Sequence, residues 1–215
     1  DCAALEGHAG DYAVLADVIQ SLPHDDIPVH FALGNHDHRE NFLAAFANAK
    51  PKGETAVANK YVSILETPHA NWFLLDSLDR TNHTPGLLGE AQLKWLATAL
   101  DARPDKPALV VMHHTPDPGA KGSGLHDTEA LYEVILPRKQ VKAYVFGHSH
   151  TWRLGKVDDL HLINLPATAW LFGDYRLRGW IDALLRPNGV ALTVRGLTPD
   201  VPHHGETFDL TWRQS

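Results

Sequence analysis

The sequence predicts an α/β fold made of one domain. Its 215 residues, 44% of them hydrophobic, suit a single core of ordinary size. Segments with helical spacing alternate with short apolar runs through the first part of the chain, as in strands joined by helices. The last part holds short runs separated by turn residues, which is typical of antiparallel hairpins. We therefore expect residues 1–215 to form one domain, with α/β structure first and a β-meander last.

The helices are predicted by apolar residues that recur every three or four positions. The first runs from Asp11 to Leu22 and stops before Pro23, because proline cannot continue a helix. The predicted helices are residues 11–22, a short segment around Phe42 to Phe46, Leu93 to Leu100, and a segment around Leu131 to Ile135.

The strands are predicted by short apolar runs between Gly, Pro and Asp residues. The run 108–112 is continuously apolar, which is typical of a strand buried on both faces. Pro187-Asn188-Gly189 separates the last two runs and favours a hairpin. The predicted strands are residues 27–33, 61–65, 72–75, 108–112, 141–146, 160–165, 179–185 and 190–194.

Composition excludes several classes of function. The chain has 19 Lys and Arg against 26 Asp and Glu, a net charge of −7, so it offers no basic surface for coating a nucleic acid. No run approaches the roughly 18 apolar residues of a membrane span. Cys2 is the one cysteine, which excludes a disulfide framework and a cysteine-cage zinc site. The compartment and the oligomeric state stay open, with a soluble cytoplasmic protein slightly favoured.

Histidine is frequent, with 15 residues in 215, and several histidines follow predicted strands. The carboxyl ends of strands in α/β sheets converge on one edge, where sites are assembled. Amide oxygens and imidazoles bind metals, so we expect a metal site at this edge. The loops at Asn35 and at His148, taken singly, are also compatible with ordinary solvated turns. The loops are Gly34-Asn35-His36-Asp37, His113-His114 and Gly147-His148-Ser149-His150.

The backbone alternation of strands suggests how these side chains point. Residues two apart face the same side, so His148 and His150 are expected to face one metal cluster. Neighbours point apart, so we expect only one of His113 and His114 to bind metal.

These motifs, in this order, resemble the calcineurin-like metallophosphoesterase superfamily. The family pattern runs Asp-x-His, Gly-Asp, Gly-Asn-His-Asp/Glu, a His after a strand, and Gly-His-x-His, at the strand ends of a four-layer α/β/β/α sandwich of mixed sheets. The Asp-x-His element is absent, and the chain opens at Asp1 without Met. The resemblance therefore implies an N-terminally truncated domain whose first strand lies outside the chain.

The resemblance also implies two divalent metal ions, which are manganese, iron or zinc. One metal takes Asn35, His113 and His148, the other takes His150 with the absent Asp and His, and Asp1 bridges the two. Asp11, in the literal Gly10-Asp11, is the alternative to Asp1. It lies at the start of a predicted helix, however, where a carboxylate caps the first turn.

The implied reaction is hydrolysis of a small-molecule phosphoester by a hydroxide that bridges the metals. His36 would protonate the leaving group, and Asp37 would hold the His36 imidazole in its orientation. Phosphodiesters are favoured, because the paired histidines before a proline resemble the phosphodiesterase branch. The alternatives are a phosphomonoesterase of the same family and a non-catalytic scaffold or interaction domain, the latter motivated by the absent Asp-x-His. The candidates for contact with the substrate are His114, Arg39 and His126.

Overall fold

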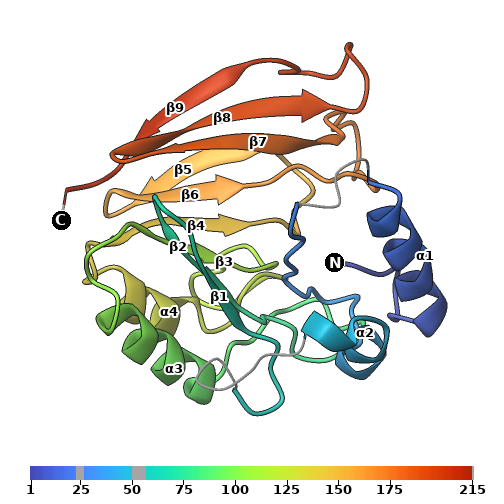
Figure 1. Ribbon diagram of the computed structural model, residues 1–215, viewed down its shortest axis with the longest axis horizontal. Coiled ribbons are helices and arrows are strands. Elements are labelled where there is room, and N and C mark those ends of the chain that lie inside the picture. Colours follow the sequence, from blue (N-terminus) through green and yellow to red (C-terminus); the bar gives the residue numbers. More distant parts are fainter. Residues whose placement is uncertain (23–26, 50–56, 215) are drawn as a thin grey trace.

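Two β-sheets organise the fold in the computed structural model, which describes residues 1–22, 27–49 and 57–214 (Figure 1). The strands are β1 Ser63–Glu66, β2 Asn71–Leu74, β3 Ala108–Val111, β4 Val141–Phe146, β5 Arg153–Val157, β6 Leu160–Asn164, β7 Gly179–Arg186, β8 Gly189–Gly196 and β9 Thr207–Thr211. The larger sheet has six strands in the order β1-β2-β3-β4-β6-β5, and the smaller has the order β7-β8-β9. The predicted α/β class with a terminal β-meander is confirmed.

The predicted helices are all present, with shifted ends. They are α1 Ala9–Gln20, α2 Arg39–Ala45, α3 Glu90–Asp101 and α4 Thr128–Ile135, and a 3-10 turn, η1, covers Ala47–Ala49. Helix α1 begins two residues before the predicted Asp11, since the Asp11 carboxylate accepts a hydrogen bond from the backbone N–H of His8 and caps the first turn. Pro23, the predicted stop, lies outside the described residues.

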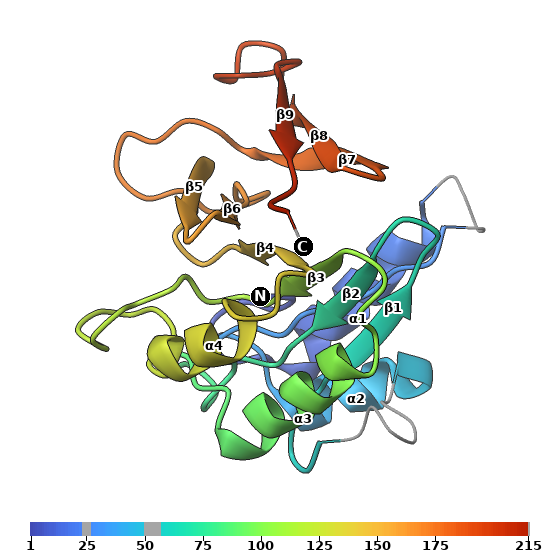
Figure 2. The same cartoon turned by 90° about the vertical axis from the view of Figure 1, so that its left-hand side faces the viewer.

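The centre of the larger sheet is parallel, with an antiparallel strand at each edge. Strands β2, β3, β4 and β6 run parallel, whereas β1 and β5 pair antiparallel with β2 and β6. Every residue of β4 is buried, because α3 and α4 cover one face of the sheet and β7–β9 cover the other (Figure 2). The mostly apolar run 141–146 thus reflects burial on both faces, with Lys142 as its one charged residue.

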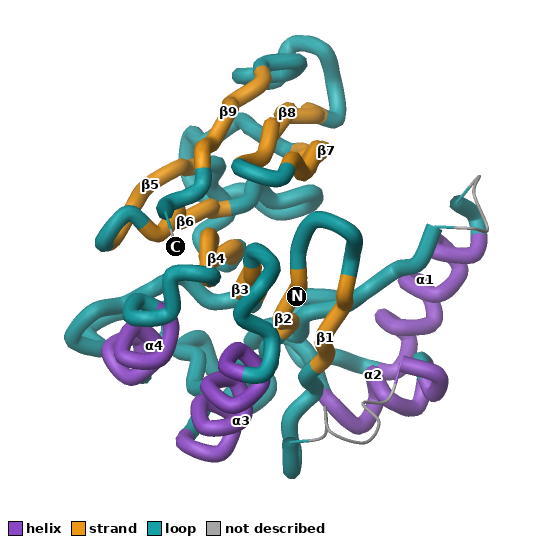
Figure 3. Tube along the Cα trace, turned by 60° about the vertical axis from the view of Figure 1, so that its left-hand side comes forward, coloured by secondary structure: helices purple, strands orange, loops and turns teal. Residues whose placement is uncertain are grey.

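The layers are helices, six-stranded sheet and three-stranded sheet, with α1 and α2 paired at one side (Figure 3). The outer face of β7 leaves Trp180 and Leu184 exposed. No described helix lies over that face, so the fourth layer of the expected sandwich stays a prediction, as does a single domain for residues 1–215. No helix among the described residues has both the length and the apolar character needed to cross a membrane.

The strand predicted over residues 27–33 is wrong. The segment passes from α1 to the site as a loop, and none of the described strands pairs with it. A strand exists only where a neighbour shares its backbone hydrogen bonds, and apolar residues alone do not supply one. Leu33 is nevertheless buried, with Tyr12, Phe42 and Tyr61, in a small core beneath α1 and α2. Strands β5 and β9 were not predicted, since β5 is an exposed edge strand and β9 is short, with only Phe208 and Leu210 as apolar residues.

Candidate metal centre

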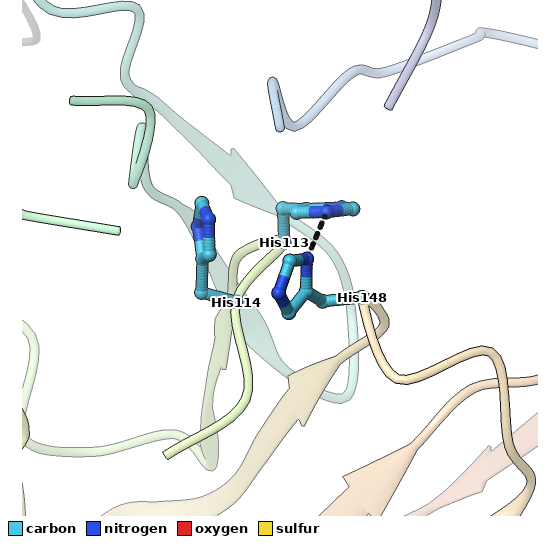
Figure 4. A group of neighbouring side chains, drawn as sticks. All are labelled: His113, His114 and His148. Carbon is cyan, nitrogen blue, oxygen red and sulfur yellow. Dashed lines mark hydrogen bonds between the residues drawn. The ribbon is translucent and has the colours of Figure 1, made fainter. Parts of the chain in front are cut away.

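The Nε2 atom of His113 lies close to three other polar side-chain atoms. It is 3.0 Å from Nδ1 of His148, 3.1 Å from Oδ1 of Asn35 and 3.3 Å from Oδ2 of Asp1. Figure 4 shows His113 and His148 facing each other across the shortest of these contacts. One imidazole nitrogen carries at most one proton, so it can donate to only one of the three atoms.

These separations fit a shared cation. Neighbouring ligands on an octahedral ion with bonds of about 2.1 Å lie about 3.0 Å apart, which is close to the contacts around His113. Imidazole nitrogens mixed with carboxylate and amide oxygens suit manganese, iron or zinc better than calcium. The side chains that the sequence motifs predicted as ligands of one metal therefore fit a divalent cation.

The imidazoles of this cluster are held neutral. Burial lowers the pKa of His113 well below its usual range. Burial also lowers the pKa of His148 to about 4, against a smaller opposing effect of a hydrogen bond with the backbone of Ser123. Metals bind the neutral form of imidazole, so both rings offer a lone pair at neutral pH without first losing a proton.

Gly34 makes room for the cluster. A Cβ atom at this position would overlap Oδ1 of Asp1 and lie 2.6 Å from Cγ of His113, closer than any real Cβ contact. The same Asp1 oxygen accepts a hydrogen bond of 3.0 Å from the backbone N–H of His36. The absent side chain thus lets the carboxylate and the imidazole pack directly against the backbone before Asn35, which is buried.

The loop after β4 differs from the extended form that the sequence suggested. His148 has φ +64° and His150 has φ +56°, so both lie in the left-handed region and the same-side argument for extended backbone does not apply. The ring of His150 stacks on Phe172 with centroids 4.5 Å apart.

One ring nitrogen of His150 is available to a metal. Its Nδ1 is buried and has no hydrogen-bond partner among the described residues. Burial lowers the pKa of His150, against a smaller opposing effect of a hydrogen bond with the backbone of Trp170. Metals bind the neutral form of imidazole, so this ring can offer the lone pair of Nδ1.

His36 is oriented by a backbone carbonyl. Its Nδ1 lies 2.9 Å from the carbonyl oxygen of Leu5, to which it donates. The Asp37 carboxylate, expected to orient His36, is fully buried and accepts hydrogen bonds from the backbone N–H groups of Cys2 and Gly34 and from the Tyr12 hydroxyl. The expectation that Asp37 orients His36 is therefore wrong. The Asp37 carboxylate holds the loop backbone in place and makes no hydrogen bond to the imidazole of His36.

His114 faces away from the cluster of ligand atoms. Its Nε2 donates to the carbonyl oxygen of Thr84 at 2.9 Å, so its Nδ1, 2.8 Å from the Ser77 Oγ, accepts from that hydroxyl. The nitrogens of His113, His114 and His148 do lie within 4.8 Å of one another. Because both nitrogens of this fully buried ring are already bonded, we assign His114 to supporting the site, and the substrate contact expected for it is not supported.

Two other candidates for substrate contact lie apart from the ligand atoms. Arg39 pairs with the buried Asp76, with its Nε 2.6 Å from Oδ2 and its Nη2 3.0 Å from Oδ1, so its guanidinium is not free to bind a phosphate, contrary to expectation. His126 is exposed, and its Nε2 lies 3.3 Å from the Gly122 carbonyl oxygen, so a substrate contact there stays a prediction. Asp11, the alternative bridging residue, caps α1.

The histidines of the site are supported partly by residues that the motifs did not indicate. His114 contacts the Ser77 hydroxyl, and His148 contacts the backbone of Ser123. His36 contacts the Leu5 carbonyl oxygen. Two of these contacts use the backbone, which carries no sequence signal at all.

Comparison with known proteins agrees with the geometry. A family model described as calcineurin-like phosphoesterase matches residues 7–152. The 3′,5′-cyclic adenosine monophosphate phosphodiesterase CpdA of Haemophilus influenzae is 31% identical over 150 residues, which cover 67% of this chain and 52% of that protein. The glycerophosphodiester phosphodiesterase GpdQ of Enterobacter lignolyticus is 29% identical over 170 residues, covering 75% of this chain and 58% of that protein.

The fold also matches a solved structure. A dimetal phosphatase from Danio rerio superimposes with a TM-score of 0.70 over 95% of this chain and 79% of that chain, at 17% identity. At this identity the likeness concerns the fold alone. The chain spans about half the length of the curated relatives that it matches.

Proposed function

We propose, since the chain belongs to the calcineurin-like phosphoesterase family, that the protein hydrolyses phosphoester bonds, with phosphodiesters preferred, at a centre of two divalent metal ions. The observation that carries the proposal is the convergence of Asp1, Asn35 and His148 on the Nε2 atom of His113, at 3.0 to 3.3 Å. One imidazole proton cannot satisfy all three atoms, whereas one cation can.

The ligands divide between the two cations. Asn35, His113 and His148 would hold the first, and the Asp1 carboxylate would be shared. His150, with its free and buried Nδ1, would hold the second, together with an Asp and a His that the family pattern places before Asp1. When bound, two such cations offset the charge of a phosphate and lower the pKa of water enough for attack near neutral pH.

His36 is suited to protonate the leaving group. The Leu5 carbonyl can only accept, so Nδ1 of His36 keeps its proton whether the ring is charged or neutral. Proton transfer must therefore use Nε2, for which no described residue provides a hydrogen bond. A charged His36 would donate from Nε2 to the leaving oxygen and return to a neutral ring of fixed orientation.

The preference for diesters has two supports. The names of the relatives describe enzymes that act on cyclic nucleotides and glycerophosphodiesters. In addition, the Arg39 guanidinium is paired with the Asp76 carboxylate, so it is not available to bind the second negative charge of a phosphomonoester.

The test compares bis(p-nitrophenyl) phosphate with p-nitrophenyl phosphate, using the full-length protein with added Mn²⁺ and with a chelator as the control. We expect turnover of the diester that exceeds turnover of the monoester and that the chelator abolishes. Faster hydrolysis of the monoester would favour a phosphomonoesterase of the same family. Inertness toward both substrates in a protein that holds Mn²⁺ would favour a non-catalytic scaffold.

A further inference from the structure

We propose that Asn164 is a positioning residue for the two histidines of the loop after β4, acting through Ser149 and Thr151. The inference rests on the proposed function, because it concerns the ligands His148 and His150. It assigns a role to three polar side chains that bind one another beside the metal centre and that no sequence motif singled out.

The strand order places Asn164 directly beneath this loop. Strands β4 and β5 are consecutive in the chain, yet β6 lies between them in the sheet. The connection 147–152 must therefore cross the carboxyl end of β6. Asn164 is the last residue of β6 and pairs with Phe146, the last residue of β4, and with Arg153, the first residue of β5.

The side chain of Asn164 holds both hydroxyl residues of the loop. Its Nδ2 donates to Oγ of Ser149 at 2.5 Å and to Oγ1 of Thr151 at 2.8 Å. The two hydroxyl oxygens are themselves 2.8 Å apart and share a hydrogen bond. Asn164 is only 5% exposed, so water does not compete freely for these bonds. We call these three residues the loop brace.

The brace alternates with the ligands along the chain. Ser149 lies between His148 and His150, and Thr151 follows directly, so fixing the two hydroxyl residues limits the backbone on both sides of His150. Both histidines lie in the left-handed region, which residues with a Cβ adopt reluctantly. Such a conformation persists only where neighbouring contacts impose it, and the brace supplies these contacts.

Loss of the brace would act on metal binding. Without it, the loop could relax toward ordinary backbone angles and draw Nδ1 of His148 away from Nε2 of His113, now 3.0 Å distant. Removing a group that supports a metal ligand typically weakens metal affinity about 10- to 100-fold. A merely structural role would instead lower thermal stability and leave metal affinity unchanged.

Asn71 provides a matched control. It is also a buried asparagine in the six-stranded sheet, 2% exposed, and its Oδ1, like that of Asn164, has no hydrogen-bond partner among the described residues. It begins β2, at the amino end of the parallel strands, whereas the metal centre lies at their carboxyl end. Replacing either asparagine by leucine removes a buried amide of similar size.

The experiment titrates Mn²⁺ into chelator-stripped full-length protein by calorimetry, with melting temperatures measured in parallel. We expect Asn164→Leu to weaken Mn²⁺ binding at least tenfold, and Asn71→Leu to stay within twofold of the unmodified protein even where its melting temperature falls. A folded Asn164→Leu variant that binds Mn²⁺ within twofold of the unmodified protein would overturn the inference. Equal losses of Mn²⁺ affinity in Asn164→Leu and Asn71→Leu would overturn it as well. Absence of Mn²⁺ binding in the unmodified protein would instead refute the proposed metal centre.

A second pair of variants applies where Asn164→Leu does not fold. Thr151→Val keeps the shape of the side chain and removes the hydroxyl, whereas Thr151→Ser keeps the hydroxyl. We expect weaker Mn²⁺ binding in the first variant and affinity near that of the unmodified protein in the second. Equal affinities in the two variants would contradict the role of the brace.

Discussion

The Nδ1 atom of His148 lies 3.0 Å from the Nε2 atom of His113, although the two residues are 35 positions apart and follow different strands. Strands β3 and β4 are parallel neighbours, so the loops that follow them leave the sheet side by side. The backbone N–H of Gly147 also donates to the His113 carbonyl oxygen at 2.9 Å, which ties the two loops together. The contact between the two imidazoles is therefore a consequence of the sheet.

Gly34→Ala is expected to disrupt metal binding. Its Cβ would meet both Asp1 and His113 at distances below 3 Å, so the Asp1 carboxylate and the His113 ring must shift to relieve the clash. Gly10→Ala is the control, because a Cβ at Gly10 meets nothing within 4 Å, and alanine favours the α1 helix by up to about 1 kcal/mol. Metal content after dialysis should fall in the first variant only. Full metal content in Gly34→Ala would contradict the packing described here.

His36→Ala is expected to keep its metal and lose turnover. Loss of a general acid typically lowers kcat about 10²- to 10⁴-fold. The loss should be larger for a diester with an alkyl leaving group than for bis(p-nitrophenyl) phosphate, because nitrophenolate leaves without a proton. The exposed His69 serves as the control, and His69→Ala should match the unmodified enzyme. Equal losses for both kinds of leaving group would exclude the acid role.

Stability of the metal-free protein should depend on pH through its buried histidines. Burial lowers the pKa of His114 from 6.5 to about 3, so the unfolded chain binds more protons than the folded chain in this range. The free energy of unfolding should therefore fall as pH decreases below 6.5 and go on falling until about 3. One such histidine contributes a loss of about 2 kcal/mol between pH 6.5 and 5.

Urea unfolding at pH 7 and pH 5 measures this effect. His114→Gln removes one titrating group and should show a smaller difference between the two pH values. An equal difference in His114→Gln and the unmodified chain would assign the dependence to other groups.

Arg39→Met is expected to lower stability rather than substrate affinity. The substitution leaves the Asp76 carboxylate, whose side chain is 0% exposed, without its ion-pair partner. Breaking a buried pair in this way typically costs about 3–5 kcal/mol. Arg103→Met, which breaks the more exposed pair with Glu66, should lower stability far less, because solvent screens that pair. A raised KM for Arg39→Met at unchanged stability would restore the phosphate contact that the sequence suggested.

The sequence predicts the strands that carry the site better than it predicts the loops. The buried runs 108–112 and 141–146 identify β3 and β4, because a strand covered on both faces is mostly apolar, with Lys142 as the one charged residue in these two runs. The run 27–33 is similarly apolar, yet none of the described strands pairs with it, and pairing is a tertiary property that no local pattern encodes.

The conformation of the loops depends on contacts that are distant in the sequence. The left-handed backbone of His148 and His150 is held by Asn164, whose position beneath them follows from the strand order rather than from any motif. For the same reason Asp37 binds Cys2 and Tyr12 instead of its neighbour His36. Motifs therefore indicate which residues come together at the site. The hydrogen-bond partners of these residues are given only by the structure.

Metal stoichiometry of the full-length protein tests the central claim most directly. Elemental analysis after exhaustive dialysis should find two divalent metal ions per chain, and fewer than two in His148→Ala, with His69→Ala unchanged. Absence of stoichiometric metal in the unmodified protein, or an unchanged content in His148→Ala, would contradict the assignment of the His113 and His148 cluster as a metal centre.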